Sequence, residues 1–203
     1  MSELFSIQLQ NRQQQGGDGV WLDLPTTTEQ VQVALRQIGI SSDNPQGLFI
    51  SGYFAEEEKR FAISYNMVLA SNVDELNFLA SRLETLSTGE RAELNAALQA
   101  PQSELFSIGR ITDFPENVDY YVHLPDVHGP AQLGDYYLNR SGMVNMPEEW
   151  KGGIDTAQFG RYVAQQEQGA FTQYGYLVKS GDEWQKVHEG QPVPEEYRVL
   201  SFP

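Results

Sequence analysis

The sequence predicts an α+β fold, and three observations support that prediction. Short apolar alternations bounded by Gly and Pro, which are typical of strands, occur near both ends of the chain. Capping signals followed by leucines at helical spacing, which are typical of amphipathic helices, fill the middle. Hydrophobic residues make up 40% of the 203 residues and aromatic residues 11%, which is enough for packed cores. We therefore expect residues 1–66 to be α+β, residues 67–102 to be helical and residues 103–203 to be α+β again.

Three strands are expected in the first segment. Residues 4–9 alternate loosely, residues 20–24 form a short strand that Pro25 stops, and residues 48–54 form a third strand. The polar, Gly-rich residues 11–19 indicate a loop between the first two strands. Together these segments predict a compact sheet.

One helix is expected to accompany this sheet. Thr26 and Glu29 have the spacing of a capping box, and Gly39 supplies a C-terminal stop. Between them, apolar residues recur at the spacing of one helix face: Val31, Ala34, Leu35 and Ile38.

Two helices are expected in the middle segment. Asn72 with Glu75, and Ser87 with Glu90, are capping signals for the first and second helix. The buried stripe of the first helix is Leu76, Leu79, Leu83 and Leu86, and that of the second is Leu94, Ala97 and Leu98. Because only a few residues join them, we expect the two helices to pack as an antiparallel pair.

Residues 103–203 give a mixed pattern. Helices are expected at 103–112, at 131–141 with Gly142 as the stop, at the turn 147–151, and from Asp155 to about residue 166. Strands are expected at 118–124, 171–178 and 183–187, the last two joined by a hairpin turn at 180–182. Residues 192–203 read as a loosely packed tail.

The charge of the chain is its strongest compositional signal. Twenty-eight acids against thirteen Lys and Arg give a formal net charge of −15, and residues 71–150 hold thirteen of the acids and four of the bases. One interpretation is a solvated surface that keeps the protein soluble. Another is imitation of nucleic acid, because duplex DNA carries one negative charge per ~1.7 Å of its axis and its binders are built around that field.

Several functional classes are disfavoured by what the sequence lacks. It has no Cys, which excludes disulfides and thiolate metal sites and fits a reducing cytosol. It has no Gly-rich phosphate loop, no nucleophile elbow and no basic patch interleaved with aromatics, so we expect no cofactor and no direct nucleic-acid binding. No secretory signal and no membrane span is expected, and we predict a cytoplasmic protein.

Two enzymatic alternatives stay open from the residues alone. His123 and His128, with Asp126 between them, can be drawn as ligands of a hard metal ion in a small hydrolase. A carboxylate pair for glycoside chemistry is the other, because an acidic chain offers many such pairs. The more ordinary interpretation of the histidines is a role in a surface loop, and we expect no metal site and no catalytic residue.

The order of residues resembles that of the ArdA antirestriction proteins. Trp21-Leu22-Asp23-Leu24-Pro25 is similar to their N-terminal part, and Asp74-Glu75-Leu76-Asn77 to the start of their central helical domain. The most specific match is Leu133-Gly134-Asp135-Tyr136-Tyr137-Leu138, followed by Ser141-Gly142 and Pro147. Ile154-Asp155, Phe159-Gly160-Arg161 and Gly175-Tyr176 continue it, so the resemblance extends to about residue 178.

This resemblance implies both an architecture and a function. It implies an elongated chain of three small domains, at 1–66, 67–102 and 103–203, with a homodimer contact in the last. It implies that the protein occupies the DNA-binding cleft of type I restriction–modification enzymes of a bacterial host by imitating bent duplex DNA. Such genes usually travel on mobile elements. The alternative is an acidic interaction module that binds another basic DNA-binding protein.

Two groups of residues are candidates for that function. The candidate acidic surface consists of all the acids of residues 71–150, namely Asp74, Glu75, Glu84, Glu90, Glu93, Glu104, Asp113, Glu116, Asp119, Asp126, Asp135, Glu148 and Glu149. The antirestriction segment, which the resemblance links to the dimer contact, maps onto Leu133, Tyr136, Tyr137, Leu138, Gly142 and Met143. From the sequence, the apolar members of that segment fit an interface or an internal core equally well.

Overall fold

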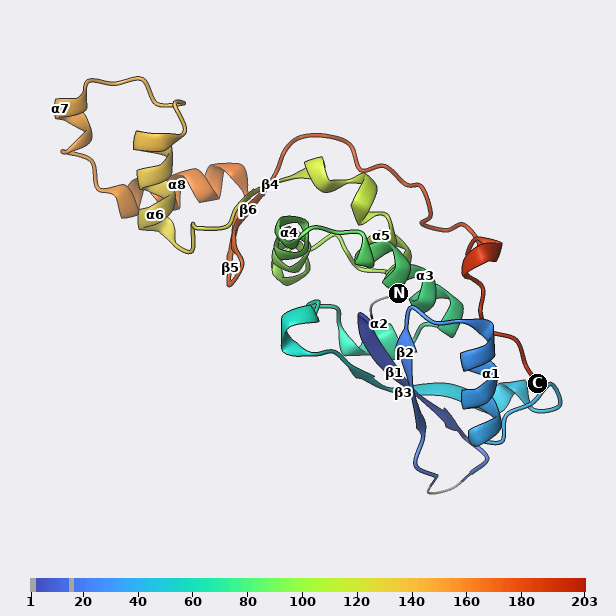
Figure 1. The fold of residues 1–203 in the computed structure, drawn as a ribbon. Coiled ribbons are helices and arrows are strands. Elements are labelled where there is room, and N and C mark those ends of the chain that lie inside the picture. Colours follow the sequence, from blue (N-terminus) through green and yellow to red (C-terminus); the bar gives the residue numbers. More distant parts are fainter. Residues whose placement is uncertain (1–2, 15–16) are drawn as a thin grey trace. The chain divides into compact units, whose positions relative to one another are not determined.

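A computed structural model describes residues 3–14 and 17–203 (Figure 1). It confirms the α+β class, because these residues form helices and two three-stranded antiparallel sheets. They gather into two compact units, each built from separate stretches of the chain. The first unit contains the described residues of Met1–Ser87 with Leu105–Glu116 and Gln185–Pro203, and the second contains Thr88–Glu104 with Asn117–Trp184.

The sheet of the first unit contains the three strands that were predicted. β1 (Phe5–Asn11) lies in the centre and pairs antiparallel with β2 (Val20–Leu24) on one side and β3 (Leu48–Phe54) on the other. A register shift between Gln8 and Leu9 interrupts the second pairing. Alternate residues of β1, beginning with Phe5, point into the core and are almost fully buried, which is the period-two pattern of a strand with one buried face.

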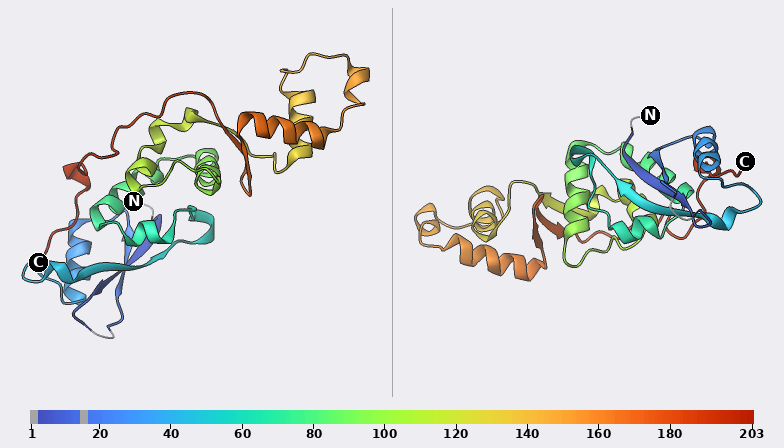
Figure 2. Two further views of the ribbon diagram at one scale, coloured as in Figure 1. Left: turned by 180° about the vertical axis from the view of Figure 1, so that it is seen from behind. Right: turned by 90° about the horizontal axis from the view of Figure 1, so that it is seen from below.

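Helix α1 (Thr28–Gln37) lies beside this sheet (Figures 1 and 2). Its apolar stripe is buried as predicted, and Gly39 ends it with a φ of +67°. The predicted capping box was one residue early, because Thr27 and Gln30 form both reciprocal bonds. The backbone N–H of Thr26 instead donates to the side chain of Asn77, at 2.7 Å.

Two further helices of the first unit begin at residues whose side chains cap them. In α3 (Val73–Glu84), Asn72 and Glu75 form both bonds of the predicted box, and the predicted leucine stripe is buried. The helix expected over 103–112 begins only at Ile108, because the Ser107 side chain caps it there. The other helices of this unit are α2 (Tyr65–Leu69), α5 (Ile108–Thr112) and the short 3₁₀ turns η1 (Pro45–Gly47), η2 (Glu57–Lys59) and η3 (Phe114–Glu116).

The C-terminal residues of this unit form what we call the C-terminal strap, residues 185–203. They were predicted as part of a strand and a loose tail, and both predictions were wrong. Residues 183–187 form no strand, whereas the turn η6 (Glu195–Tyr197) stacks Tyr197 on Phe78, with ring centroids 4.6 Å apart. Val199 is 5% exposed, so the strap is packed on its unit.

The sheet of the second unit has the order β4–β6–β5, with β4 (Tyr121–Leu124), β5 (Ala170–Thr172) and β6 (Gly175–Lys179). The hairpin therefore turns between β5 and β6 and not at residues 180–182 as predicted. The expected strand 118–124 is divided into the 3₁₀ turn η4 (Val118–Tyr120) and β4. Helix α4 (Thr88–Gln99) packs against β6 and β4, whereas the main partner of α3 is α5.

A helical pair completes the second unit. α6 (Pro130–Asp135) continues into the π-helix η5 (Tyr136–Arg140), and together they form the helix that was predicted over 131–141, beginning one residue earlier. Gly142 ends this run with a φ of +71°, as expected. α7 (Glu148–Lys151) is the predicted turn, and Asp155 caps α8 (Thr156–Glu167) as predicted.

Glycines allow α6 and α8 to pack closely. A Cβ on Gly134 would lie 1.9 Å from the carbonyl oxygen of Thr156, and a Cβ on Gly160 would lie 1.8 Å from that of Pro130. Neither position has room for any side chain, so the two helix backbones are in direct contact. In the part of the chain that the structure covers, no helix has the length and apolar character of a membrane-spanning segment.

Candidate functional site

The candidate acidic surface divides into acids bonded within the fold and acids that face solvent. This division matters because a carboxylate whose oxygens already accept internal hydrogen bonds is less available to a partner. We take the bonded acids first.

Asp113 is not a surface residue, which corrects its prediction. Its side chain is fully buried, and its two oxygens accept the backbone N–H groups of Val187 (3.2 Å), His188 (2.6 Å) and Glu189 (3.1 Å). The carboxylate therefore binds the C-terminal strap to α5. Arg110 lies next to it and forms an ion pair with Glu189 at 3.5 Å.

Asp74 holds the other end of the strap. Its Oδ1 accepts the backbone N–H groups of Val199 (2.8 Å) and Leu200 (2.7 Å). Glu75, beside it in the first turn of α3, accepts the N–H of Asn72 in the capping box. Both acids are half-buried, and their bonds are local to the first unit.

Four further acids are paired with cations. Glu104 accepts hydrogen bonds from Lys179 (2.5 Å) and from the Tyr120 hydroxyl (2.7 Å). The bond between Glu104 and Lys179 raises the pKa of Lys179. The other pairs are Glu116 with Arg82, Asp135 with Arg140 at 3.1 Å, and Glu148 with Lys151 at 2.6 Å. Each such pair places a positive charge beside the carboxylate and so reduces the negative charge of the surface around it.

Glu93 is the acid with the most altered titration. Burial of its side chain raises the pKa of Glu93 to about 8, and the negative charges of Glu90 and Asp119 add to the rise. Its Oε1 is buried and has no hydrogen-bond partner among the residues that the structure describes. Glu93 is therefore mostly protonated at neutral pH and contributes little negative charge there.

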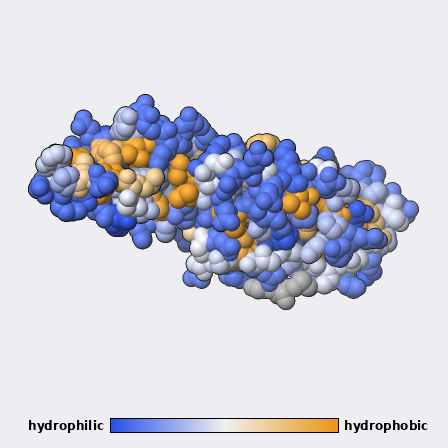
Figure 3. Space-filling model, turned by 90° about the horizontal axis from the view of Figure 1, so that it is seen from above, coloured by the Kyte–Doolittle hydropathy of each residue, from blue (hydrophilic) through white to orange (hydrophobic). Residues whose placement is uncertain are grey.

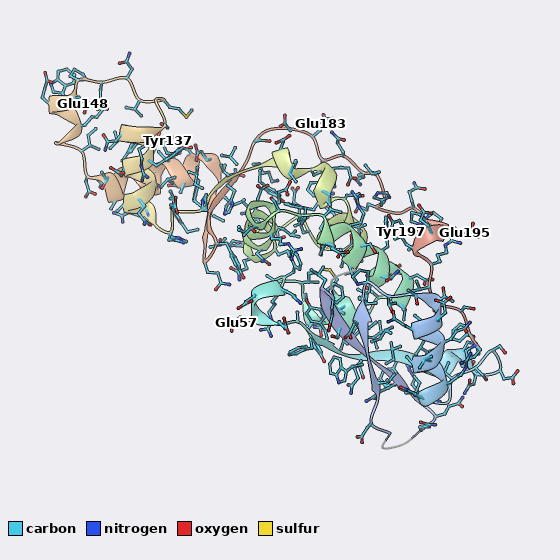
Figure 4. The ribbon with its side chains drawn as sticks, viewed as in Figure 1. Glu57, Tyr137, Glu148, Glu183, Glu195 and Tyr197 are labelled. Atoms are coloured by element: carbon cyan, nitrogen blue, oxygen red, sulfur yellow. The ribbon has the colours of Figure 1, made fainter. Side chains whose placement is uncertain are left out.

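The acids that do face solvent include some that the predicted set left out. Of that set, Asp119, Asp126, Glu148 and Glu149 are exposed, and Glu84 and Glu90 are half-buried. Exposed acids outside it, among the described residues, are Glu3, Asp18, Asp23, Glu29, Asp43, Glu56, Glu57, Glu58, Asp155, Asp182, Glu183, Glu195 and Glu196. Figure 4 shows Glu57, Glu183 and Glu195 pointing outward. Figure 3 shows a face dominated by hydrophilic side chains, with hydrophobic ones in small patches.

The antirestriction segment is partly core and partly surface. Leu133 and Leu138 are 0% and 3% exposed, and Leu133 belongs to the core cluster that contains Tyr176. Tyr136 and Tyr137 are half-buried and meet edge to face, with ring centroids 5.5 Å apart. Gly142 and Met143 face solvent, and Met143 is 75% exposed.

Sequence reasoning missed Glu167, the last residue of α8. Its Oε1 accepts from the hydroxyl of Tyr137 at 2.5 Å and its Oε2 from the hydroxyl of Tyr176 at 2.9 Å. Burial raises the pKa of both tyrosines, and the hydrogen bond and the charge of Glu167 raise it further. No spacing rule links these residues, because three different elements supply them.

The histidines that the sequence left open as alternative metal ligands lie in ordinary surroundings. His123 Nε2 lies 2.7 Å from the carbonyl oxygen of Tyr174, and His128 is exposed. Asp113, Glu116 and His188 do bring ligand atoms within 4.8 Å of one another. Asp113 already accepts three N–H groups and Glu116 pairs with Arg82, so we assign no ion to this group.

Together these features define an acidic α+β protein that uses several of its acids to hold its own fold together. A family model described as antirestriction protein (ArdA) matches residues 16–178. Because this match covers well over half of the 203 residues, the chain belongs to the ArdA family, which implies an antirestriction function. Among curated proteins, the search found no match to this chain.

Proposed function

We propose that this protein inhibits type I restriction–modification enzymes by occupying their DNA-binding cleft as a mimic of bent duplex DNA. It acts as a binding protein and not as an enzyme, in the cytoplasm of a bacterial host. The observation that carries the proposal is a net charge of −15 on a folded chain of the ArdA family. A cleft lined by Lys and Arg attracts such a surface as it attracts phosphates.

The solvent-facing acids carry the mimicry in this proposal. Carboxylates on one helix face are ~5–6 Å apart at i, i+4, which is comparable with the spacing of phosphates along a strand. An exposed ion pair contributes only ~0–1 kcal/mol, so affinity has to come from many carboxylates acting together. Asp74 and Asp113 are excluded from the set because they bind the strap.

The proposal includes the elongated arrangement of three small domains and a homodimer. DNA must be bent to fit such a cleft, at a cost of order 1–6 kcal/mol. A folded protein with a fixed curve avoids that cost, because a preorganised binding surface lowers the free energy of deformation that binding has to offset. A symmetric dimer would double the length of the acidic strip.

One pair of experiments tests this function. Unmodified phage is plated on a type I restricting host with and without the gene, and plating efficiency is expected to rise with the gene. In vitro, the purified protein competes with duplex DNA for a type I methyltransferase, and its inhibition is expected to weaken as salt rises. Inhibition that is independent of salt would contradict the electrostatic mechanism, and unchanged plating would contradict the function.

A further inference from the structure

Glu167 joins the antirestriction segment to the core of the second unit. It ends α8, while Tyr137 comes from η5 and Tyr176 from β6. Both carboxylate oxygens are used, each by one phenol hydroxyl. We call this arrangement the Glu167 bracket. Hydrogen bonds to a charged acceptor are about twice as strong as neutral ones, so the bracket holds two elements to the end of one helix.

The Tyr176 side of the bracket is rigid. Tyr176 is 0% exposed and lies in the core cluster with Leu133. The chain passes so closely over its hydroxyl that a Cβ on Gly169 would lie 2.0 Å from that oxygen. Core packing therefore holds Tyr176 in addition to its bond with Glu167, whereas Tyr137 bonds the other oxygen of the same carboxylate at the end of α8.

The Tyr137 side leads outward to solvent. The backbone carbonyl of Tyr137 accepts the hydroxyl of Ser141 at 2.9 Å, and the same hydroxyl oxygen accepts the N–H of Met143 at 3.1 Å. A chain of hydrogen bonds thus runs from Glu167 through Tyr137 and Ser141 to Met143, which is 75% exposed. Figure 4 shows Tyr137 where this stretch lies beside α8.

Two further features set this stretch apart from an ordinary packed helix. Tyr136–Arg140 is a π-helix, closed by the bond from Ser141 N–H to the Tyr136 carbonyl at 2.8 Å, and such turns are rare and occur frequently at functional sites. A hollow of about 370 Å³ adjoins it, lined by Tyr136, Tyr137, Met143 and Glu167 with Val122 and Val178. Side-chain packing alone therefore leaves space around the segment.

We propose that Glu167 is a positioning residue for antirestriction, which holds the segment from Tyr136 to Met143 in its active conformation by accepting the Tyr137 hydroxyl. The inference rests on the proposed function and deepens it. Glu167 acts through Tyr137 and not as one of the charges that imitate phosphate. The bracket therefore matters for inhibition although half-buried Glu167 adds little to the acidic surface.

Two matched tyrosine variants separate positioning from stability. Tyr137→Phe and Tyr176→Phe each remove one hydroxyl from the same carboxylate and leave the net charge unchanged. We expect Tyr137→Phe to weaken inhibition of the methyltransferase about tenfold, as for loss of one bond to a charged group, and Tyr176→Phe to weaken it less than threefold. If both variants lose inhibition in proportion to the decrease in their melting temperatures, the bracket has only a structural role and the proposal is wrong.

Two glutamate variants separate positioning from charge. Glu167→Gln and the exposed Glu149→Gln each remove one negative charge from the second unit. We expect about a tenfold loss of inhibition for Glu167→Gln with the salt dependence unchanged, and less than a twofold loss for Glu149→Gln. Equal losses in the two variants would show that Glu167 acts only as a charge.

The wild-type protein distinguishes this inference from the proposed function. If the wild type does not inhibit the methyltransferase, the proposed function has failed, and hydrogen exchange still tests the bracket. In that measurement, the amides of Ser141 to Met143 are expected to exchange faster in Tyr137→Phe than in the wild type or in Tyr176→Phe. Unchanged exchange together with wild-type inhibition in Tyr137→Phe would overturn the inference alone.

Discussion

Asp113 is a buried carboxylate whose oxygens accept three backbone N–H groups of the C-terminal strap. A buried polar group that loses its partner costs about 1–3 kcal/mol, and here three donors depend on one side chain. The charge of Asp113 therefore serves folding and not recognition.

We predict that Asp113→Ala lowers the free energy of unfolding by about 2–4 kcal/mol, because it leaves three part-buried N–H donors without an acceptor. Urea unfolding followed by fluorescence measures the change. The exposed Asp119→Ala is the control and should change stability by less than about 0.5 kcal/mol. Equal stability of the two variants would mean that the strap does not depend on Asp113.

Glu93 makes stability depend on pH. Its pKa is raised to about 8 in the folded protein, so the folded state holds a proton that the unfolded state releases above its ordinary value of 4.5. Stability from this group is fully present below pH 4.5 and is lost as pH rises toward 8.

We predict that Glu93→Gln removes this loss. The variant should be more stable than the wild type at pH 8 by on the order of 1–2 kcal/mol, a figure reduced for the partial exposure of the side chain. Thermal melting at pH 5 and pH 8 measures it, with Glu149→Gln as the control. A difference between wild type and variant that is the same at both pH values would contradict the shifted titration.

At the scale of elements, the second unit depends on the close packing of two helices. α6 and α8 are in backbone contact at Gly134 and Gly160, where a side chain has no space. We predict that Gly134→Ala destabilises the protein by about 1–3 kcal/mol or more, because its Cβ would overlap the Thr156 carbonyl. Circular dichroism during urea titration measures the loss.

Gly152 provides the matched control for this substitution. A Cβ on Gly152 meets nothing within 4 Å, and the residue has a φ of −63° that alanine adopts freely. Gly152→Ala should therefore be neutral or slightly stabilising. Tolerance of alanine at Gly134 would show that the two helices can separate without cost.

The strap is the other feature at this scale. Residues 185–203 lie beyond the part that matches the ArdA model, which ends at residue 178. Asp113 binds one end of the strap and Asp74 the other, and between them the ring of Phe78 packs against His188 and Tyr197. In this chain the strap completes the first unit and uses two acids that the charge pattern alone assigns to the surface.

Charge acts at the scale of the whole molecule, and its effect should be collective. We predict that Glu149→Gln alone changes inhibition of the methyltransferase less than about twofold. Neutralising Asp119, Asp126, Glu148, Glu149 and Glu90 together should abolish it. The competition assay measures both, with circular dichroism to show that the fold is kept. A single dominant carboxylate among them would indicate an active site instead of a mimic.

The proposed dimer is tested at its most exposed apolar residue. Met143 is 75% exposed at the end of the antirestriction segment, so a charge there should not disturb folding. If Met143 lies in the dimer contact, Met143→Lys should give monomers by light scattering, because a lone charge is costly in an apolar interface. Gln166→Lys makes the same change in charge at an exposed position of α8. It is the control and should keep the oligomeric state of the wild type. An unchanged dimer for Met143→Lys would place the contact elsewhere.

Local signals in the sequence predicted most of the elements. Loose alternation predicted β1, and short strand-like runs predicted β2 and β3. The cap at Asn72 and the stop at Gly142 were also correct, because these features depend on neighbouring residues alone. The errors, such as the false strand at 183–187, fall where a short segment has too few apolar residues to specify one structure. The packing of the two middle helices against each other stays a prediction.

The sequence by itself determined the class of fold, the acidity and the family resemblance, since each depends on composition or on residues close together in the chain. Only the tertiary structure decided which acids remain available. It brings Val187 to Asp113 and Glu167 to Tyr137, over separations of 74 and 30 residues. The physical reason is that burial and hydrogen-bond partners come from contacts between distant segments, whereas formal charge belongs to each residue alone.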